Sequence, residues 1–316
     1  MATGVLAIVA PGQGSQKPGM LTPWLEIGDL ATTLADWSEA AGLDLTRLGT
    51  TADADEIKDT AVTQPLVVAS ALLAASALAI PAAAITGGHS VGELAAAAIA
   101  GVLEPVDAVS LAARRGAAMA QACAAVSTSM AAVMNPDTEA VLAALAERDL
   151  VGANVNGGGQ IVAAGSSEQI AALVAQPPAG MRVIQLAVAG AFHTAYMQPA
   201  QDEFRPLLDA ITPGEPNRPL LTNSDGTLVD SGARYLTLLG SQITHPVRWD
   251  RCMATLSGLG VTGLLELPPA GTLVGLAKRE LKGADGKAIA TMALKTPDDL
   301  EAAAGFLAEH ADGAAA

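Results

Sequence analysis

The chain has 316 residues, of which 51% are hydrophobic and 3% are aromatic. A chain of this length and content can bury a large aliphatic core without disulfide staples. Its net charge of −15 argues against nucleic acid as a partner, because phosphate binding needs clustered Lys and Arg. The two cysteines, Cys123 and Cys252, have no C-x-x-C spacing, so we expect free thiols in a reducing cytoplasm. We find neither metal-ligand spacing nor an apolar run of about 18 residues, and we expect no metal and no membrane.

The predicted elements alternate between strands and helices along the chain. Residues 5–10 form a continuous apolar run, which is typical of a strand covered on both faces. Helical patterns follow at 30–41 and at 64–79. Short apolar strands recur between further helical stretches, at 160–164, 182–188, 263–267 and 288–292. This alternation predicts an α/β fold.

A smaller unit is predicted between about residues 127 and 190, where the order of elements changes. It has the size and order of an α+β subdomain inserted into a larger domain. Its predicted elements are a strand at 130–134, a helix at 137–148, a strand at 160–164, a helix at 167–175 and a strand at 182–188.

The segment GHSVG at 88–92 predicts a nucleophile elbow. It follows a short apolar stretch and precedes a strongly helix-forming run at 93–100, with Gly101 as a stop. In such an elbow a serine sits on a tight turn between strand and helix, with the helix N-terminus facing any oxyanion that forms. Ser90 is therefore the candidate nucleophile for acyl chemistry.

The segment GQG at 12–14, directly after the first strand, has more than one interpretation. It begins a dinucleotide-binding fingerprint, but the third glycine of that pattern would fall on Lys17, which argues against a nicotinamide cofactor. A tight glycine turn at this strand end can instead aim a main-chain N–H at the elbow as an oxyanion donor. It can equally be an ordinary turn.

Ser90 needs a base, and the chain has four histidines. His89 adjoins the nucleophile and is expected to point away from it; His245 precedes a proline, and His310 lies near the end of the chain. By elimination His193 is the best placed base, although a histidine in such a loop can also be structural.

A predicted helix from 105 to about 122 carries two adjacent arginines on different stripes. When residues four apart are followed along the helix, Arg114 continues a polar stripe, whereas Arg115 lies between Leu111 and Met119 on an apolar stripe. We therefore expect Arg115 to be half-buried. A buried guanidinium needs an anionic partner, which is either an internal carboxylate or the carboxylate of a ligand.

Motifs spread over nearly the whole chain occur together in one order: PGQGSQ at 11–16 with GM at 19–20, QP at 64–65, GHSVGE at 88–93, RRG at 114–116 with Met119, NVN at 154–156, AFH at 191–193, and Gln242 with PVRW at 246–249. In this combination the sequence resembles the malonyl-CoA:acyl carrier protein transacylase family of bacterial type II fatty-acid synthesis. It is also similar to the related acyltransferase domains of polyketide synthases.

The resemblance implies a role for each matching residue. Ser90 would be the acylated nucleophile and His193 its base, and the main-chain N–H groups of Gln13 and Val91 would form the oxyanion hole. Arg115 would grip the malonyl carboxylate.

Two further positions follow from the same resemblance. The main-chain carbonyl of Gln242 would orient the imidazole in place of an aspartate. Phe192 would narrow the space at C2 and disfavour methylmalonyl groups.

The resemblance also implies a fold and a reaction. The expected fold is an α/β-hydrolase-like large domain with a parallel sheet core, at 1–127 and 191–316, plus a small ferredoxin-like subdomain at 128–190. The expected reaction is ping-pong transfer of malonyl from malonyl-CoA to the phosphopantetheine thiol of acyl carrier protein, through malonyl-Ser90. We expect a cytoplasmic monomer that needs no cofactor beyond these substrates.

Two alternative functions stay open at this stage. A serine hydrolase or thioesterase of the α/β-hydrolase type also predicts G-x-S-x-G, but it does not explain Arg115. A non-catalytic scaffold that binds the carrier would not need both Ser90 and His193.

Acyl carrier proteins of this family are expected to be acidic, like this chain. The densest basic stretch, Lys278, Arg279, Lys282 and Lys287, is therefore a candidate docking patch, against the alternative of a solvated helix face.

Overall fold

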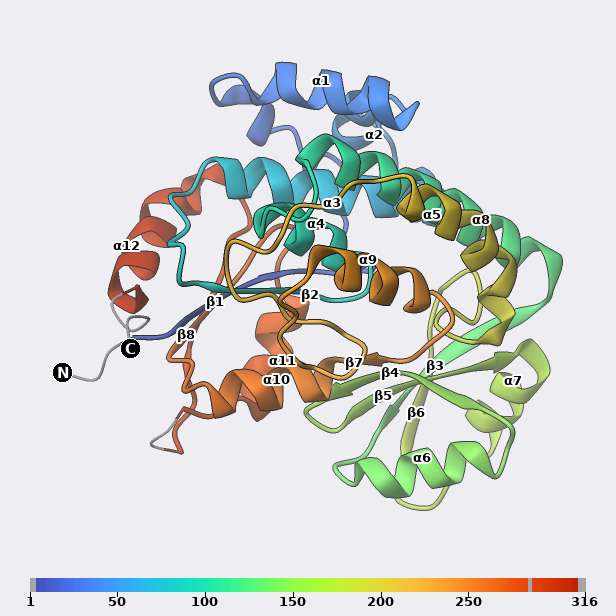
Figure 1. Ribbon diagram of the computed structural model, residues 1–316. Coiled ribbons are helices and arrows are strands. Elements are labelled where there is room, and N and C mark those ends of the chain that lie inside the picture. The colour runs from blue at the N-terminus through green and yellow to red at the C-terminus, as the bar shows by residue number, and fades with distance from the viewer. Residues whose placement is uncertain (1–3, 284–285, 312–316) are drawn as a thin grey trace.

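The computed structural model describes residues 4–283 and 286–311 (Figure 1). Its first sheet has four strands in the order β2-β1-β8-β9, and all its neighbouring strands are parallel. The strands are β1 (Leu6–Ala10), β2 (Ile85–Gly88), β8 (Gly263–Glu266) and β9 (Ala290–Ala293). A mixed α/β fold with a parallel sheet is thus confirmed.

Helices cover both faces of this sheet, which explains the unbroken apolar run of β1. Leu6 and Ile8 pack into the cluster that contains α3 (Thr60–Ser76), α4 (Gly92–Ile99) and α5 (Pro105–Ala125). Ala7 and Val9 point to the other face, toward α10 (Trp249–Gly258) and α11 (Thr272–Glu280). Figure 1 shows the two helical layers on opposite sides of β1 and β2. Helix α3 is buried around nearly its whole circumference, and the preceding residue Asp59 caps its N-terminus: the Asp59 carboxylate accepts from the Ala61 N–H at 2.8 Å.

The second sheet has five strands in the order β6-β3-β5-β4-β7. Its pairs are antiparallel except the pair of β4 with β7, which is parallel. Helices α6 (Thr138–Ala146) and α7 (Ser167–Ala175) pack with one face of this sheet, while Met130 and Val162 on the other face join the large core. The strands are β3 (Thr128–Met134), β4 (Val151–Gly157), β5 (Gln160–Ser166), β6 (Arg182–Gln185) and β7 (Val247–Arg248).

The remaining elements complete the outer layers. The helices are α1 (Leu30–Ala41), α2 (Leu45–Thr50), α8 (Gln198–Asp209), α9 (Gly232–Ser241) and α12 (Leu300–His310). Short 3-10 turns are η1 (Trp24–Glu26), η2 (Glu56–Lys58), η3 (Ala195–Met197) and η4 (Pro297–Asp299). Within the described residues, no helix combines the length and the apolar character needed to cross a bilayer.

Outside the small unit the predicted elements exist, but some have shifted ends: the helix expected at 64–79 is α3 (Thr60–Ser76), and the strand expected at 288–292 is β9 (Ala290–Ala293). The helices expected at 30–41 and 167–175 match α1 and α7. The strand expected at 182–188 ends at Gln185, because the chain then leaves the sheet after Leu186 donates to the carbonyl of Met130 at 3.0 Å. Strand β4 was not predicted, and the sheet also takes in β7 from outside residues 128–190.

Candidate active site

Ser90 lies on a tight turn between β2 and α4, at the carboxyl end of the parallel sheet. Its backbone φ is 52°, a left-handed value that non-glycine residues rarely adopt. The flanking glycines permit this turn, since a Cβ at Gly88 would overlap the main chain of Gly92, and one at Gly92 would overlap the carbonyl of Ala10. The sequence thus places Ser90 as an elbow requires.

Asn223 holds the elbow in place, although sequence reasoning did not identify it. The main-chain N–H of Ser90 donates to Asn223 Oδ1 at 2.7 Å, and Asn223 Nδ2 donates to the carbonyl of Gly88 at 2.7 Å. No spacing in the sequence connects an asparagine at 223 with a motif at 88–92, because the contact is made by the fold alone.

Ser90 and His193 form a hydrogen-bonded pair. Ser90 Oγ and His193 Nε2 are 2.7 Å apart, and His193 Nδ1 is 2.8 Å from the main-chain carbonyl of Gln242. A carbonyl accepts only, so it fixes the proton on Nδ1 and leaves Nε2 free to take the hydroxyl proton of Ser90. Burial and the nearby charge of Arg115 lower the pKa of His193 to about 3, which keeps the imidazole neutral as a base requires.

The other histidines have partners elsewhere. His89 Nε2 is 2.9 Å from Asn156 Oδ1, His245 Nδ1 is 2.9 Å from the carbonyl of Ser241, and His310 Nδ1 is 2.9 Å from Thr262 Oγ1. His193 is therefore the histidine that contacts the nucleophile.

Arg115 is completely buried, so the expectation of a half-buried side chain was wrong. The apolar pattern of the helix indicates only which face of α5 carries Arg115. It does not reveal that α3 and the segment after α9 enclose the guanidinium. Its Nη1 donates to Gln64 Oε1 at 2.6 Å, and its Nη2 donates to Gln242 Oε1 at 2.8 Å and to Ser90 Oγ at 3.3 Å.

The charge of Arg115 has no carboxylate in direct contact. The ion pairs found among the described residues are Arg47–Glu56 and Arg248–Asp250. Burial lowers the pKa of Arg115 to about 10, so it is still a cation at neutral pH. Its Nε has no hydrogen-bond partner among the described residues. A guanidinium in this state beside a nucleophile is suited to an anionic substrate group.

A cavity of about 430 Å³ opens in front of Ser90 and His193. Gln13, Val91 and Phe192 line it with Ser90 and His193. Arg115 and Gln242 are not among its lining residues and join the group through hydrogen bonds, from Arg115 to Ser90 Oγ and from His193 to the carbonyl of Gln242. The turn at 12–14 lies against the elbow, because a Cβ at Gly12 would come within 2.9 Å of the His89 carbonyl. The small sheet and α11 supply further walls, with Met130, Asn154, Asn156, Gln160 and Val162 on one side and Thr272, Leu273 and Leu276 on the other.

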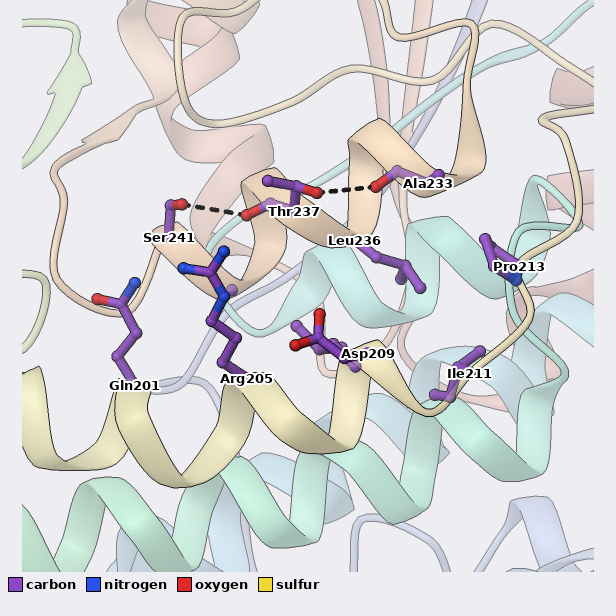
Figure 2. Close-up of a pocket in the computed structure, with 11 residues that line it drawn as sticks. Gln201, Arg205, Asp209, Ile211, Pro213, Ala233, Leu236, Thr237 and Ser241 are labelled. Atoms are coloured by element: carbon purple, nitrogen blue, oxygen red, sulfur yellow. Dashed lines mark hydrogen bonds between the residues drawn. The ribbon is translucent and has the colours of Figure 1, made fainter.

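A second cavity, of about 240 Å³, lies between α8 and α9 (Figure 2). Gln201, Arg205 and Asp209 from α8 face Thr237 and Ser241 from α9 across it. It contains neither Ser90 nor His193. Among the residues that the structure describes, no group of three or more His, Cys, Asp or Glu side chains could hold a metal ion.

A serine–histidine pair on an elbow, with a buried cation beside the serine, defines a class of acyl-transferring enzymes. The chain belongs to the acyl transferase family, whose domain model matches residues 8–311. It is 52% identical over 302 residues to the malonyl CoA-acyl carrier protein transacylase of Mycobacterium tuberculosis strain H37Rv, covering 94% of this chain and 98% of the relative. The relative of that name in Mycolicibacterium smegmatis is 54% identical over 290 residues, which is 89% of this chain and 98% of the relative. The resemblance drawn from the motifs is confirmed.

Solved structures agree with this assignment. The crystal structure of MCAT from Mycobacterium tuberculosis superimposes with a TM-score of 0.90 at 52% identity, covering 95% of this chain and 99% of the other. A chain from the solved complex of a type II polyketide synthase acyl-carrier protein with its malonyl-transacylase superimposes with a TM-score of 0.86 at 30% identity, covering 95% of this chain and 99% of that one.

Proposed function

We propose that this chain transfers the malonyl group of malonyl-CoA to the phosphopantetheine thiol of acyl carrier protein, supplying extender units for fatty-acid or polyketide synthesis. The observation that carries the proposal is the guanidinium of Arg115, which lies 3.3 Å from the nucleophilic oxygen of Ser90 without a carboxylate of its own. A hydrolase of simple acyl esters has no use for a buried cation at that place. The relatives at 52–54% identity carry the name of this activity.

The first half of the reaction acylates Ser90. The hydroxyl proton passes to His193 Nε2 as Oγ attacks the thioester carbon, and the carbonyl oxygen becomes an oxyanion. We assign the main-chain N–H groups of Gln13 and Val91 as its donors, since both residues line the cavity at Ser90. The C–S bond then breaks, and the thiolate of CoA takes the proton back from His193.

The second half reverses these steps with a different thiol. The phosphopantetheine thiol of the carrier gives its proton to His193 and attacks malonyl-Ser90, which releases the malonyl-carrier thioester and restores the serine hydroxyl. Arg115 binds the malonyl carboxylate in both halves and orients the ester. Phe192 is the residue we assign to limiting the space at C2. No resident cofactor takes part in these steps.

The finer fold assignment is also a proposal. We propose an α/β-hydrolase-like large domain at 1–127 and 191–316 and a ferredoxin-like subdomain at 128–190. Support for the second comes from the chain order β3-α6-β4-β5-α7-β6 and the spatial order β6-β3-β5-β4. We further propose a monomer that works in the cytoplasm, and the unpaired thiols of Cys123 and Cys252 support that reducing compartment.

Intact-mass analysis after brief exposure to malonyl-CoA tests the proposed function. The wild-type chain should gain one malonyl group, Ser90→Ala should gain none, and Arg115→Ala should lose malonyl labelling while slow acetyl labelling from competing acetyl-CoA appears. The loss in kcat/KM for malonyl-CoA in Arg115→Ala should be at least about 100-fold, as for a charged hydrogen bond made to substrate. Free malonate without an adduct would indicate a hydrolase, and no turnover would indicate a carrier-binding scaffold.

A further inference from the structure

Glu93 is a buried acidic residue close to Ser90, and the reaction steps above do not use it. It is the second residue of α4, and 1% of its surface is exposed. Its Oε1 accepts from the main-chain N–H of Asn223 at 2.6 Å, and its Oε2 accepts from Gln242 Nε2. Both oxygens therefore act as acceptors, which matches an ionised carboxylate, because a carboxylate only accepts.

The side chain of Gln242 connects this carboxylate to the active site. Its Nε2 donates to Glu93 and also to the main-chain carbonyl of Ser90 at 3.0 Å, and its Oε1 accepts from Arg115 at 2.8 Å. A carboxylate and a carbonyl only accept, while a guanidinium only donates. These partners leave one direction for the amide, with its nitrogen toward Glu93 and its oxygen toward Arg115.

We propose that Glu93 is a positioning residue for malonyl transfer: by accepting from Asn223 and Gln242 it fixes the direction of the Gln242 amide, and through it the place of Arg115 beside Ser90. The inference rests on the proposed function, since the malonyl carboxylate is the group that Arg115 would bind. Through Asn223, whose Oδ1 accepts from the N–H of Ser90 at 2.7 Å, the same carboxylate also reaches the elbow.

The electrostatic surroundings of Glu93 agree with this role. Burial raises the pKa of its carboxyl to about 7, and the hydrogen bonds from Asn223, Gln242 and Thr222 together with the charge of Arg115 act in the opposite direction. The carboxylate is therefore the main form above about pH 7, and the groups that offset its desolvation are the hydrogen bonds from Asn223, Gln242 and Thr222 and the charge of Arg115.

The substitution Glu93→Gln changes the hydrogen bonds offered to the Gln242 amide and keeps the size and shape of the side chain. The substituted side chain has one acceptor and one donor where two acceptors are needed. The N–H of Asn223 belongs to the main chain and cannot reverse, so the introduced oxygen must face it and the introduced NH₂ must face Gln242. The Gln242 amide then has no orientation that satisfies all its partners: as it stands, its nitrogen faces the introduced NH₂ donor to donor, and if it turns over, its nitrogen faces the guanidinium of Arg115 and its oxygen faces the carbonyl of Ser90.

The experiment compares kcat/KM for malonyl-CoA and for acetyl-CoA in wild type and Glu93→Gln. We expect kcat/KM for malonyl-CoA to fall roughly 10- to 100-fold, the usual effect of an unsatisfied buried donor. The fall for acetyl-CoA should be smaller, because acetyl has no carboxylate for Arg115, so the malonyl-to-acetyl ratio should shrink. An unchanged ratio would overturn the inference.

Two further variants keep the test decisive. Gln242→Ala removes the connecting amide but keeps the carbonyl that binds His193, so it should shrink the ratio by a similar factor. The double variant with Glu93→Gln should shrink it no further. Full additivity would mean that Glu93 acts on the fold and not through Gln242. If Glu93→Gln does not fold, Gln242→Ala decides alone, and a wild-type ratio in that variant would overturn the inference.

Tyr235→Phe is the matched control. The hydroxyl of Tyr235 donates to the main-chain carbonyl of Glu93 at 3.3 Å, so its removal disturbs the same residue without touching the carboxylate. The malonyl-to-acetyl ratio should stay at the wild-type value, and a shrunken ratio would overturn the inference. If the wild-type protein forms no malonyl-Ser90, the proposed function itself is wrong. If the wild type is labelled but Glu93→Gln keeps the wild-type malonyl-to-acetyl ratio, only the role of Glu93 is wrong.

Discussion

Ser90 and His193 both have a left-handed backbone, with φ of 52° and 60°. Such values cost of order 1–3 kcal/mol in non-glycine residues and persist only where neighbouring groups hold them. Asn223 accepts from the main chain of Ser90, and the carbonyl of Gln242 fixes the ring of His193. The strained backbone of these two residues is thus part of the arrangement that holds Ser90 Oγ 2.7 Å from His193 Nε2.

His193 should stay neutral over the whole working pH range. Burial and the charge of Arg115 lower its pKa from 6.5 to about 3. We expect the ¹⁵N spectrum of labelled protein to show a neutral ring protonated on Nδ1 from about pH 8 down to about pH 5, where an ordinary histidine is mostly charged. The His193→Ala spectrum assigns the signal. An imidazolium signal from His193 at the lower pH would contradict this expectation.

The sign of the linked stability follows from the same shift. Since the unfolded chain protonates His193 near pH 6.5 and the folded chain only near 3, its contribution to stability is present above pH 6.5 and is lost as the pH falls toward 3. Glu93 has the opposite sign, because its pKa is raised to about 7 and the folded state holds its proton more tightly. The two effects offset each other in total stability, so the spectrum of His193 is the sharper measurement.

At the scale of elements, the turn from β2 into α4 depends on its closeness to β1. A Cβ at Gly92 would lie 2.7 Å from the carbonyl of Pro11 and would also overlap that of Ala10. We expect Gly92→Ala to lower the free energy of unfolding by about 1–3 kcal/mol, because the helix must shift away from β1. The same shift displaces Ser90, so malonylation should slow by at least about 10-fold. Urea unfolding and the rate of adduct formation by mass spectrometry measure the two effects.

Gly305→Ala in α12 is the control for that substitution. Apart from its chain neighbours and the backbone of its own helix, no heavy atom of the described residues lies within 4 Å of a Cβ built at Gly305. Alanine should therefore raise stability by about 0.5–1 kcal/mol, as in other helix interiors, and leave malonylation unchanged. Equal effects of the two substitutions would show that the contact of α4 with β1 does not position the nucleophile.

The elements that could be predicted are those whose signal is local. Helices α1 and α7 match the expected residues because their apolar periodicity and end signals lie within one stretch. Strand β4, with the sequence VGANVNG, has glycine and asparagine where a strand usually has apolar or β-branched residues. It exists because β5 and β7 pair with its two edges, and a partner such as β7 lies about 90 residues further along the chain.

The site divides in the same way. Ser90, His193 and Arg115 belong to local motifs, and the structure brings them together. Asn223 and the contact of Glu93 with Gln242 were not predicted, since each depends on segments that only the folded chain brings side by side. The complete burial of Arg115 was missed for this reason too.

At the scale of the whole molecule, the active-site cavity lies where the two sheets and α11 meet. Residues of β3, β4 and β5 form one wall, and Leu276 of α11 lies on another. Lys278 and Arg279 follow Leu276 within the same helix and are exposed, as is Lys282 just after it. On a chain with a net charge of −15, this is a local cationic surface beside the cavity, and it is where we expect the acidic carrier to dock.

Reversing the charges of this surface should raise KM for the acyl carrier protein and leave KM for malonyl-CoA unchanged. In a triple variant, Lys278→Glu, Arg279→Glu and Lys282→Glu, we expect KM for the carrier to rise roughly 10-fold at low salt, because rim charges act mainly on encounter. KM for malonyl-CoA should not change. The difference should shrink as salt screens the surface over a Debye length of about 10 Å at 0.1 M.

A second triple variant separates a local surface from total charge. Arg205→Glu, Arg234→Glu and Lys295→Glu change the net charge equally, but these exposed residues lie on α8, on α9 and after β9, and not on the helix α11 that lines the active-site cavity. Since electrostatic steering by a patch depends on where the charges lie, this variant should raise KM for the carrier much less than the first. Equal increases would mean that overall repulsion between two acidic proteins governs the encounter. Unchanged carrier kinetics in the first variant would place docking on another face.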